Sequence, residues 1–461
     1  MNRSKYLIFC AVALLLLGAC RKYVENAPIQ GQRVLAYTED YRMLLNDRNN
    51  QEVAYGIAPM LSSDDADFTD AVIENRVGNN VIQRSMYTWA KPFYTDQQTD
   101  YDYNMLYSTL FVYNVVIEGV MDSKGGTEVQ RSAILGEALI RRAFNYFMLT
   151  NLHGKQYDAA TAATDPAVPL LLEPELMGDL TRTPVKTVYE QILQDTRRAI
   201  PLLPLTQEIN DRPTKAAGYA LLSKVYLFMR DFDNAAAFAD SSLALKNTLY
   251  DYNTAVAGTT LVFPAQYNDP QILLRKAQRQ VFSPLQLSQS LLNLLEPTDL
   301  RFVLFVKPGS SLSPAFSGYG FWSRSNYGGY PDNTAVGLSV NETLLIKAEC
   351  LARAGQKDAA VELLNQLRQK RFRPADYAVL AAATPEEALQ LVINERRREF
   401  FGGGLRWFDQ RRLDKDPQFQ QTVTRSFGGV QYTLAPGSNG FVFPLAQLLI
   451  QQNPEMTQNP N

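Results

Sequence analysis

Histidine is nearly absent from this sequence, and cysteine is scarce. The 461 residues include one histidine and three cysteines. A single imidazole excludes a zinc site built on two histidines and a proton relay between two imidazoles. Lysine and arginine total 45 against 47 aspartate and glutamate residues, a net charge of −2. Because there is no excess of cations to neutralise a phosphate backbone, we expect no nucleic-acid partner.

Long apolar runs are missing too. Residues 7–17 form an apolar stretch after Arg3 and Lys5, but a membrane-spanning helix needs about 20 such residues. The pattern is typical of a signal peptide. It ends in Leu-Gly-Ala-Cys at residues 17–20, which resembles a bacterial lipobox. We therefore predict a lipoprotein signal peptide over residues 1–19 and a lipid anchor on Cys20; an ordinary secretory signal is the alternative.

Helical periodicity dominates the middle of the chain. With 46% hydrophobic and 20% charged residues, the chain has enough apolar surface for a substantial core. Thr183 and Pro184 are expected to open one helix, with the hydroxyl as cap and proline at the first helical position. The spacing of apolar residues predicts helices over the following ranges: 101–120, 129–152, 184–204, 215–229 and 233–245.

The last two of these helices resemble a tetratricopeptide repeat. Ser223, Ala235 and Ala239 place small residues where two antiparallel helices would approach closely. A second copy with equivalent spacings covers residues 341–371. Because about a hundred residues separate the two copies, we do not expect an uninterrupted solenoid.

The region between the two copies is rich in proline, glycine and aromatic residues. In a compact protein such a long stretch is usually functional or disordered, and its aromatic residues argue against disorder. The predicted fold is therefore mainly α, with a tetratricopeptide-like scaffold of helical hairpins, a long irregular loop-rich region and few short strands. We expect one domain over residues 20–461, with the scaffold over residues 33–245 and 338–412 and the irregular region over residues 246–337.

Several motifs resemble those of the SusD/RagB family of outer-membrane lipoproteins from Bacteroidetes. The segment Asn-Glu-Arg-Arg-Arg-Glu-Phe at residues 394–400, followed by Arg-Trp-Phe-Asp at residues 406–409, is the most specific. Arg142, Arg-Thr-Pro-Val at residues 182–185 and the Asn-Pro pairs near the C-terminus follow the order of the family. The motif residues interpreted as structural are Arg142, Glu395, Arg398, Glu399, Arg406, Trp407 and Asp409.

This motif also has a simple physical interpretation. Glu395, Arg398 and Glu399 stand at helical neighbour spacings, which favours ion pairs along one face. The glycines at residues 402–404 are expected to end the helix through a left-handed residue. Trp407 is expected to pack in the core with its indole N–H hydrogen-bonded.

The resemblance implies a binding protein, not an enzyme, so we expect no catalytic residue, no cofactor and no metal. It implies a lipid-anchored protein of the outer membrane, expected at the cell surface, that captures oligosaccharides and delivers them to a SusC-like TonB-dependent transporter. Peptide or another non-glycan cargo is the alternative within the same architecture. A glycoside hydrolase, with two carboxyl groups about 5 to 9 Å apart, and a protein-binding tetratricopeptide adaptor are further alternatives.

Sugar rings stack on aromatic side chains and hydrogen-bond to amides, carboxylates and arginines. One predicted ligand-binding residue, Trp89, could equally belong to the core. Trp322 lies in a segment rich in glycine and aromatic residues, where a partner contact or surface packing is the alternative role. The candidate ligand-binding residues are Trp89, Trp322, Arg324, Asn326, Tyr327 and Tyr330.

Two further features invite a functional interpretation. Asp64, Asp65, Asp67 and Asp70 form an acidic cluster, for which a solvated turn with a helix cap is favoured over a calcium site because the spacing lacks a calcium-loop pattern. His153 is expected to act at the C-terminal end of a helix and not in catalysis.

Overall fold

The fold is mainly helical, as predicted, with few short strands. The computed structural model describes residues 35–460 except 176–177, 259–260, 262, 266, 281 and 327–335. The predicted signal peptide and Cys20 therefore lie outside the described residues, as do the candidates Tyr327 and Tyr330. None of the helices in the described ranges is both long enough and apolar enough to cross a bilayer.

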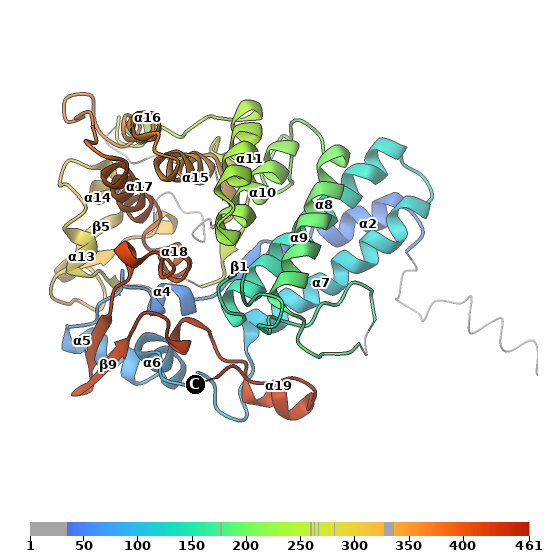
Figure 1. Ribbon diagram of the computed structural model, residues 1–461, viewed down its shortest axis with the longest axis horizontal. Helices are drawn as coiled ribbons and strands as arrows, with labels where there is room; N and C mark the ends of the chain where they lie inside the picture. Colours follow the sequence, from blue (N-terminus) through green and yellow to red (C-terminus); the bar gives the residue numbers. More distant parts are fainter. Residues whose placement is uncertain are drawn as a thin grey trace, which may run out of the picture.

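The long helices predicted from periodicity are all present. They pack in chain order, each against the next, and form the right and middle parts of the molecule in Figure 1. Strong caps fix several ends: the Thr127 hydroxyl accepts from the backbone N–H of Gln130, and Asp100 accepts from that of Asp102. The helices are α7 (Tyr101–Gly119), α8 (Glu128–His153), α9 (Val185–Ala199), α10 (Lys215–Met229) and α11 (Phe232–Leu245).

The start of α9 differs from the prediction by one residue. Pro184 is the N-cap and makes no side-chain cap bond, so proline does not occupy the first helical position. Thr183 donates its N–H to Val168 and accepts from the N–H of Ala167. These backbone bonds keep Thr183 in an extended segment, so the predicted hydroxyl cap was wrong.

The two predicted hairpins are present as α10 with α11, and as α15 (Val340–Arg353) with α16 (Lys357–Arg368). The two helices of the first hairpin approach closely: the hydroxyl of Ser223 donates to the backbone oxygen of Ala235 at 2.9 Å. Helix α11 packs directly against α15. The two hairpins are thus neighbours in space, so the helical stack continues although the chain leaves it between them.

The chain between the hairpins forms short elements. Strand β6 is central in a three-stranded antiparallel sheet, with β4 on one side and β5 on the other. Val306 pairs with Phe321 and Pro308 with Tyr319. The elements of this region are α12 (Tyr252–Ala255), β2 (Ile272–Leu274), β3 (Ala277–Gln278), β4 (Leu285–Gln286), α13 (Gln289–Leu292), α14 (Leu300–Phe305), β5 (Val306–Pro308), β6 (Tyr319–Phe321), the 3₁₀ helix η4 (Arg324–Asn326) and β7 (Leu338–Ser339).

The chain before α7 forms short elements: α2 lies beside α7 and α8, and α4, α5 and α6 lie at the lower left of the molecule in Figure 1. Strand β1 runs parallel to β3, and β2 pairs antiparallel with β7. The N-terminal elements are α2 (Thr38–Leu45), α3 (Arg48–Gln51), β1 (Val53–Tyr55), α4 (Ala58–Ser62), α5 (Ala71–Gly78) and α6 (Val81–Thr88).

The chain after α16 returns to the scaffold and then forms a hairpin of strands and a last short helix. The last elements are α17 (Pro385–Phe400), α18 (Leu405–Leu413), β8 (Val423–Phe427), β9 (Val430–Leu434) and α19 (Gln447–Gln452). The sequence analysis missed this β-hairpin. Its two-residue turn, Gly428 and Gly429, has positive φ at both positions, and a Gly-Gly pair between β-prone runs is a recognised hairpin signal.

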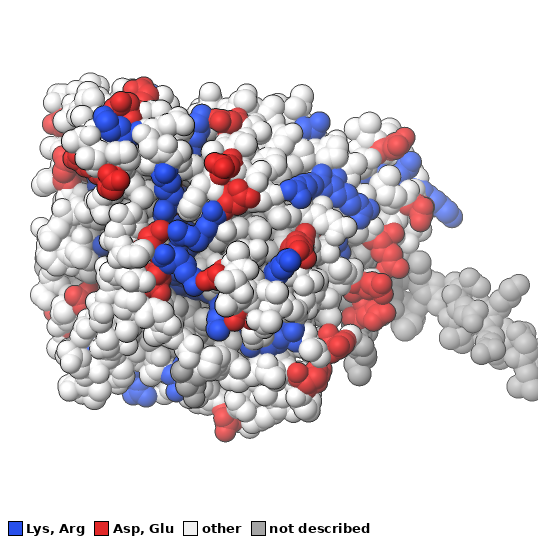
Figure 2. Space-filling model, in the orientation of Figure 1, with Lys and Arg blue, Asp and Glu red and all other residues white. Residues whose placement is uncertain are grey.

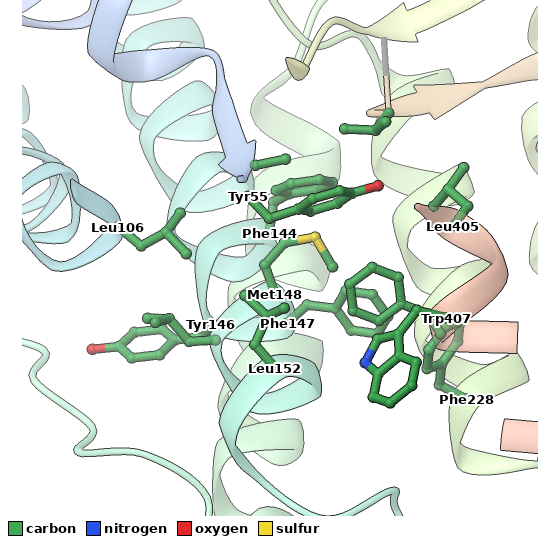
Figure 3. Close-up of a cluster of buried hydrophobic side chains, with 14 of the residues drawn as sticks. Tyr55, Leu106, Phe144, Tyr146, Phe147, Met148, Leu152, Phe228, Leu405 and Trp407 are labelled. Atoms are coloured by element: carbon green, nitrogen blue, oxygen red, sulfur yellow. The ribbon is translucent and has the colours of Figure 1, made fainter. Parts of the chain in front are cut away.

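The core is centred on α8, which is buried on all sides from Ile134 to His153. Phe144, Phe147 and Met148 of this helix lie between Tyr55 and Trp407 in Figure 3. The polar residues of α8 are paired: Arg142 Nε and Nη2 each donate to a carboxylate oxygen of Asp195 at 2.8 Å. A guanidinium this deeply buried is tolerated because the Asp195 carboxylate both balances its charge and accepts its hydrogen bonds.

Candidate functional site

The predicted family motif forms a buried network of arginines and carboxylates. Glu399 accepts from Arg371 Nη2 at 2.6 Å and from Arg301 Nη1 at 3.0 Å. Glu395 lies 2.7 Å from Arg301 and 3.3 Å from Arg398. The Glu395–Arg398 contact is the predicted helical neighbour pair. Glu399 instead pairs with arginines from α14 and from the segment after α16, so the network joins separate elements.

The charged residues of α18 extend the same pattern. Arg406 holds Asp64 through two hydrogen bonds of 2.7 and 2.8 Å. Asp409 accepts from Arg396 at 3.0 Å and from Arg412 at 2.7 Å. Because these buried groups are paired and hydrogen-bonded, the motif fixes α17 and α18 against the rest of the molecule.

Trp407 lies in the core, as predicted, with no exposed surface. Its ring stacks on Phe443 with centroids 5.1 Å apart and also contacts Phe441 at 5.5 Å. The indole N–H has no hydrogen-bond acceptor among the described residues, so the predicted hydrogen bond was wrong. The aromatic rings packed around the indole, and not a polar contact, hold this side chain.

The network predicts loss of stability in acid. Burial opposes ionisation of Glu395, but Arg301, Arg398 and Arg368 outweigh it and lower the pKa of this carboxyl to about 2. Its stabilising contribution is therefore complete above the unfolded-state pKa of about 4.3 and is lost as the pH falls toward 2, an effect of about 3 kcal/mol. Urea unfolding at pH 7, 5, 4 and 3 should show this fall.

The control for this prediction is a pair of variants. Glu395→Gln should reduce the loss of stability below pH 5 without removing it, because other buried carboxyls such as Glu399 also have lowered pKa values. Glu362→Gln, at an exposed position on α16, should leave the pH dependence unchanged. Equal urea midpoints for the wild type at pH 5 and pH 3 would contradict the assignment.

The acidic cluster near residue 65 is mostly buried. Asp64 pairs with Arg406, and Asp65 accepts from Arg397 Nε at 2.8 Å. The expectation of a solvated turn was therefore wrong for these two residues, because arginines from α17 and α18 reach them. Asp70 caps α5, as expected, by accepting from the N–H of Val72 at 2.8 Å. Within the described ranges, no group of three or more potential ligands is positioned to hold a metal ion.

His153 is the last residue of α8 and is buried. Burial, with a contribution from Arg182, lowers the pKa of its imidazole to about 3, so the ring is neutral at pH 7. A neutral ring gives the helix end no charge stabilisation, contrary to the expected role. Arg182 Nη2 instead donates to the backbone oxygen of His153 at 2.9 Å.

Trp89 lies in the core and is 7% exposed. Its indole N–H donates to the backbone oxygen of Ser62 at 2.9 Å, and the Arg425 guanidinium lies 4.3 Å from the ring centroid. With one face covered by a cation and the rest buried, the ring has no open face for a sugar. The packing supports the core alternative for this residue.

Trp322, Arg324 and Asn326 lie together at the end of β6. Trp322 is half-buried, and its backbone N–H donates to the backbone oxygen of Phe305 at 2.8 Å. Arg324 opens η4 and pairs with Asp269 at 2.7 Å. Asn326 is exposed and donates its side-chain N–H to the backbone of the same turn.

A cavity of about 120 Å³ lies beside this group of residues. Arg324 and Phe321, the neighbour of Trp322 in sequence, line it, whereas Trp322 and Asn326 do not. Its lining combines aromatic rings with fixed polar groups, the composition expected of a ligand pocket. Arg324 is held there by its ion pair and lies 4.7 Å from the ring centroid of Phe263. The cavity lining includes Tyr252, Asp269, Phe305, Arg324, Asn341 and Glu399.

The sequence analysis missed two residues of this region. Asn341 donates to Glu399 at 2.8 Å, and its side-chain oxygen has no donor among the described residues, although the residue is 5% exposed. The motif glutamate thus orients an amide that lines the cavity, a link across 58 residues that no local pattern encodes. The second residue is Tyr319, which lies at the start of β6 and is 40% exposed. Its position between two glycines in the sequence was the signal that could have identified it.

The fold and this region define a class: a tetratricopeptide-like helical protein that presents a small aromatic and polar pocket on an irregular insert. A family model described as "Starch-binding associating with outer membrane" matches residues 40–227, and a SusD family model matches residues 340–461. The chain belongs to the SusD/RagB family. Proteins of this family are binding proteins rather than enzymes.

Solved structures share the fold over almost the whole chain. A SusD superfamily protein from Bacteroides thetaiotaomicron aligns with a TM-score of 0.74 and 19% identity, covering 92% of this chain and 100% of the other. A SusD-like carbohydrate binding protein from Bacteroides vulgatus aligns with a TM-score of 0.67 and 17% identity, covering 91% and 97%. These likenesses establish the architecture.

Curated relatives match over shorter segments. SusD-like protein P38 of Formosa agariphila is 35% identical over 89 residues, which is 18% of each chain. SusD-like protein P2 of the same organism is 33% identical over 105 residues, 23% of this chain and 19% of the other. The chain therefore matches about a fifth of the length of each of these relatives.

Proposed function

We propose that this protein captures oligosaccharides at the outer membrane and delivers them to a SusC-like TonB-dependent transporter. The observation that carries the proposal is the pocket beside Trp322, in which aromatic rings and oriented polar groups meet. Membership of a family of outer-membrane binding proteins supports it. A lipid on Cys20 would hold the protein at the membrane, with the described domain outside the bilayer, on the cell surface.

The chemistry of the pocket suits a sugar. The apolar C–H face of a pyranose packs on an aromatic ring, and its hydroxyls need both donors and acceptors. Arg324 supplies fixed donors, and the side-chain oxygen of Asn341 supplies an acceptor that no described residue satisfies. Such a site binds without a nucleophile.

The acids of the pocket support binding over hydrolysis. A glycoside hydrolase needs one carboxylic acid whose pKa is raised enough to donate a proton. Burial of Glu399 works in that direction, but Arg371 and Arg301 outweigh it and lower its pKa. Asp269 is committed to an ion pair with Arg324 at 2.7 Å. Both carboxylates act as anchors for neighbouring side chains.

The test is binding of the mature domain, with Cys20 removed, to an array of plant, host and microbial glycans. Trp322, half-buried beside the cavity, would stack on a sugar that extends out of it. Trp322→Ala should therefore weaken binding of the best glycan about tenfold, because one stacked ring contributes about 1 kcal/mol beyond its buried area. Isothermal titration calorimetry measures the change, and circular dichroism checks the fold. Tyr432→Ala, a half-buried ring on β9, is the matched control and should bind as the wild type does.

Two results would refute the proposal. One is the absence of any glycan ligand on the array while a peptide pool binds. The other is release of smaller sugars from a bound glycan, which would show turnover. Delivery is tested separately: the full-length lipidated protein should co-purify from outer membranes with a TonB-dependent transporter.

A further inference from the structure

A second cavity, of about 280 Å³, lies beside α18 and the segment just before α19. Lys and Arg side chains gather in the middle of the face shown in Figure 2, over the place where α18 lies in Figure 1. The cavity lining includes Lys155, Gln156, Asp158, Arg411, Asp414 and Ser438.

Arg411 is the unusual member of this lining. It is 2% exposed and makes one hydrogen bond, from Nη2 to the backbone oxygen of Gly154 at 2.6 Å. Its Nε and Nη1 have no acceptor among the described residues. Burial lowers the pKa of this guanidinium to about 10, so it stays charged at neutral pH.

Other buried arginines of this chain are satisfied in one of two ways. Arg412, the next residue, pairs with Glu349 at 2.7 Å and with Asp409. Arg425 has no acidic partner but donates to four backbone oxygens, and Arg182 donates to four backbone oxygens and to Asn459. Arg411 has neither arrangement, although an unpaired buried donor is costly.

Two further polar atoms in the same lining have no partner. The side-chain oxygen of Gln156 and the hydroxyl of Ser438 are buried and make no hydrogen bond within the described part of the chain. The Gln156 amide N–H donates to the backbone of Phe228 at 2.9 Å, which fixes its oxygen as the free acceptor. Arg411, Gln156 and Ser438, the residues that carry these unpaired atoms, thus all line a single cavity.

The other charges of the cavity are already engaged. Lys415 pairs with Asp158 at 2.8 Å, and Lys155 pairs with Asp165 at 2.9 Å. Asp414 accepts from the backbone N–H of Gly437 at 2.7 Å. No carboxylate of the described residues pairs with Arg411, so an anionic group on a ligand can supply its counter-charge.

The cavity adjoins another of about 230 Å³, since both include Asp414 and Phe441. This neighbour is rich in side-chain amides, which donate to and accept from sugar hydroxyls. The amides lining it are Gln390, Asn394, Gln410, Gln418, Gln420 and Gln421.

We propose that the cavity beside Arg411 binds the carboxylate of an acidic saccharide, with the sugar hydroxyls donating to Gln156 and the chain continuing over the neighbouring amides. A uronate carries both required groups: a carboxylate that can accept from Arg411 and from the Ser438 hydroxyl, and adjacent hydroxyl donors. This assignment rests on the proposed function for its choice of cargo. It adds a site for charge, separate from the pocket beside Trp322.

The experiment compares trigalacturonate with its neutral methyl ester, and a triglycine peptide with its C-terminal amide, by isothermal titration calorimetry on the mature domain. The uronate should bind more tightly than its ester. Ser438→Ala should weaken uronate binding about tenfold, the worth of one hydrogen bond to a charged group, without affecting the ester. Arg411→Gln should abolish the preference for charge.

Ser438→Ala removes no hydrogen bond within the described residues, so its folding is not at risk, and Ser426→Ala on exposed β8 is the matched control. Equal affinity of uronate and ester, or a free peptide preferred over the uronate, would overturn the proposal. Trp322→Ala separates the two ideas: if it leaves glycan binding intact while the Ser438 effect persists, the pocket beside Trp322 fails and the carboxylate site stands.

Discussion

Glu399→Gln is expected to lower the free energy of unfolding by about 3 to 5 kcal/mol, the cost of removing one partner from a buried ion pair. Glutamine keeps the size of the side chain but removes the charge shared by Arg371 and Arg301. Both guanidinium groups are at most 1% exposed, so water cannot replace the lost carboxylate. Urea denaturation followed by circular dichroism measures the change.

The control is an exposed glutamate on a neighbouring helix. Glu362→Gln on α16 should change stability by less than about 0.5 kcal/mol. Combining Glu399→Gln with Arg371→Met should recover part of the loss, because the double variant removes both partners of the pair. A Glu399→Gln variant as stable as the wild type would show that the network does not hold these elements together.

The same variant connects the family motif to the ligand pocket. Glu399 accepts from Asn341 at 2.8 Å, and Asn341 lines the cavity beside Trp322. Changing the carboxylate should therefore disturb the orientation of the amide as well as the stability of the fold. The family motif therefore contributes to this cavity both directly, through Glu399, and through the orientation of Asn341.

The helices were predictable because their signals are local. The range from Lys215 to Met229 matched the prediction. Helices α7 and α11 differed by one residue at one end and α8 by one residue at each end, since apolar periodicity and capping residues lie within each segment. The start of α9 failed because a non-local bridge between Pro166 and Pro184 decided it. The hairpin around Gly428 and Gly429 has a local sequence signal, the Gly-Gly pair, but it was not predicted.

The pairing of charges was not predictable in the same way. The Glu395–Arg398 contact spans three residues and follows from helix geometry. The partners Asp64 and Arg406 are 342 residues apart, and only the folded chain brings them together. Asp64 and Asp65 of the acidic cluster therefore form buried ion pairs and do not lie in a solvated turn.

The candidate site shows the same limit. Residue type and neighbours pointed to Trp322 and Arg324, which the fold does bring together on one edge of the irregular region. They pointed equally to Trp89, whose left-handed backbone, with φ of 56°, turns the chain after α6 and buries the ring. The unpaired donors of Arg411 have no sequence signature, because they depend on the absence of an acceptor among the described residues that surround the folded side chain.

Trp407→Ala should destabilise the protein by about 3 to 5 kcal/mol, as truncation of a fully buried large aromatic does. The ring stacks on Phe443 and contacts Phe441, so it anchors the C-terminal segment to α18. The loss should appear both in urea denaturation and as faster hydrogen exchange over residues 441–460. Because the indole N–H has no acceptor among the described residues, Trp407→Phe should cost much less than Trp407→Ala. Equal losses for the two variants would mean that the N–H, and not the ring, stabilises this contact.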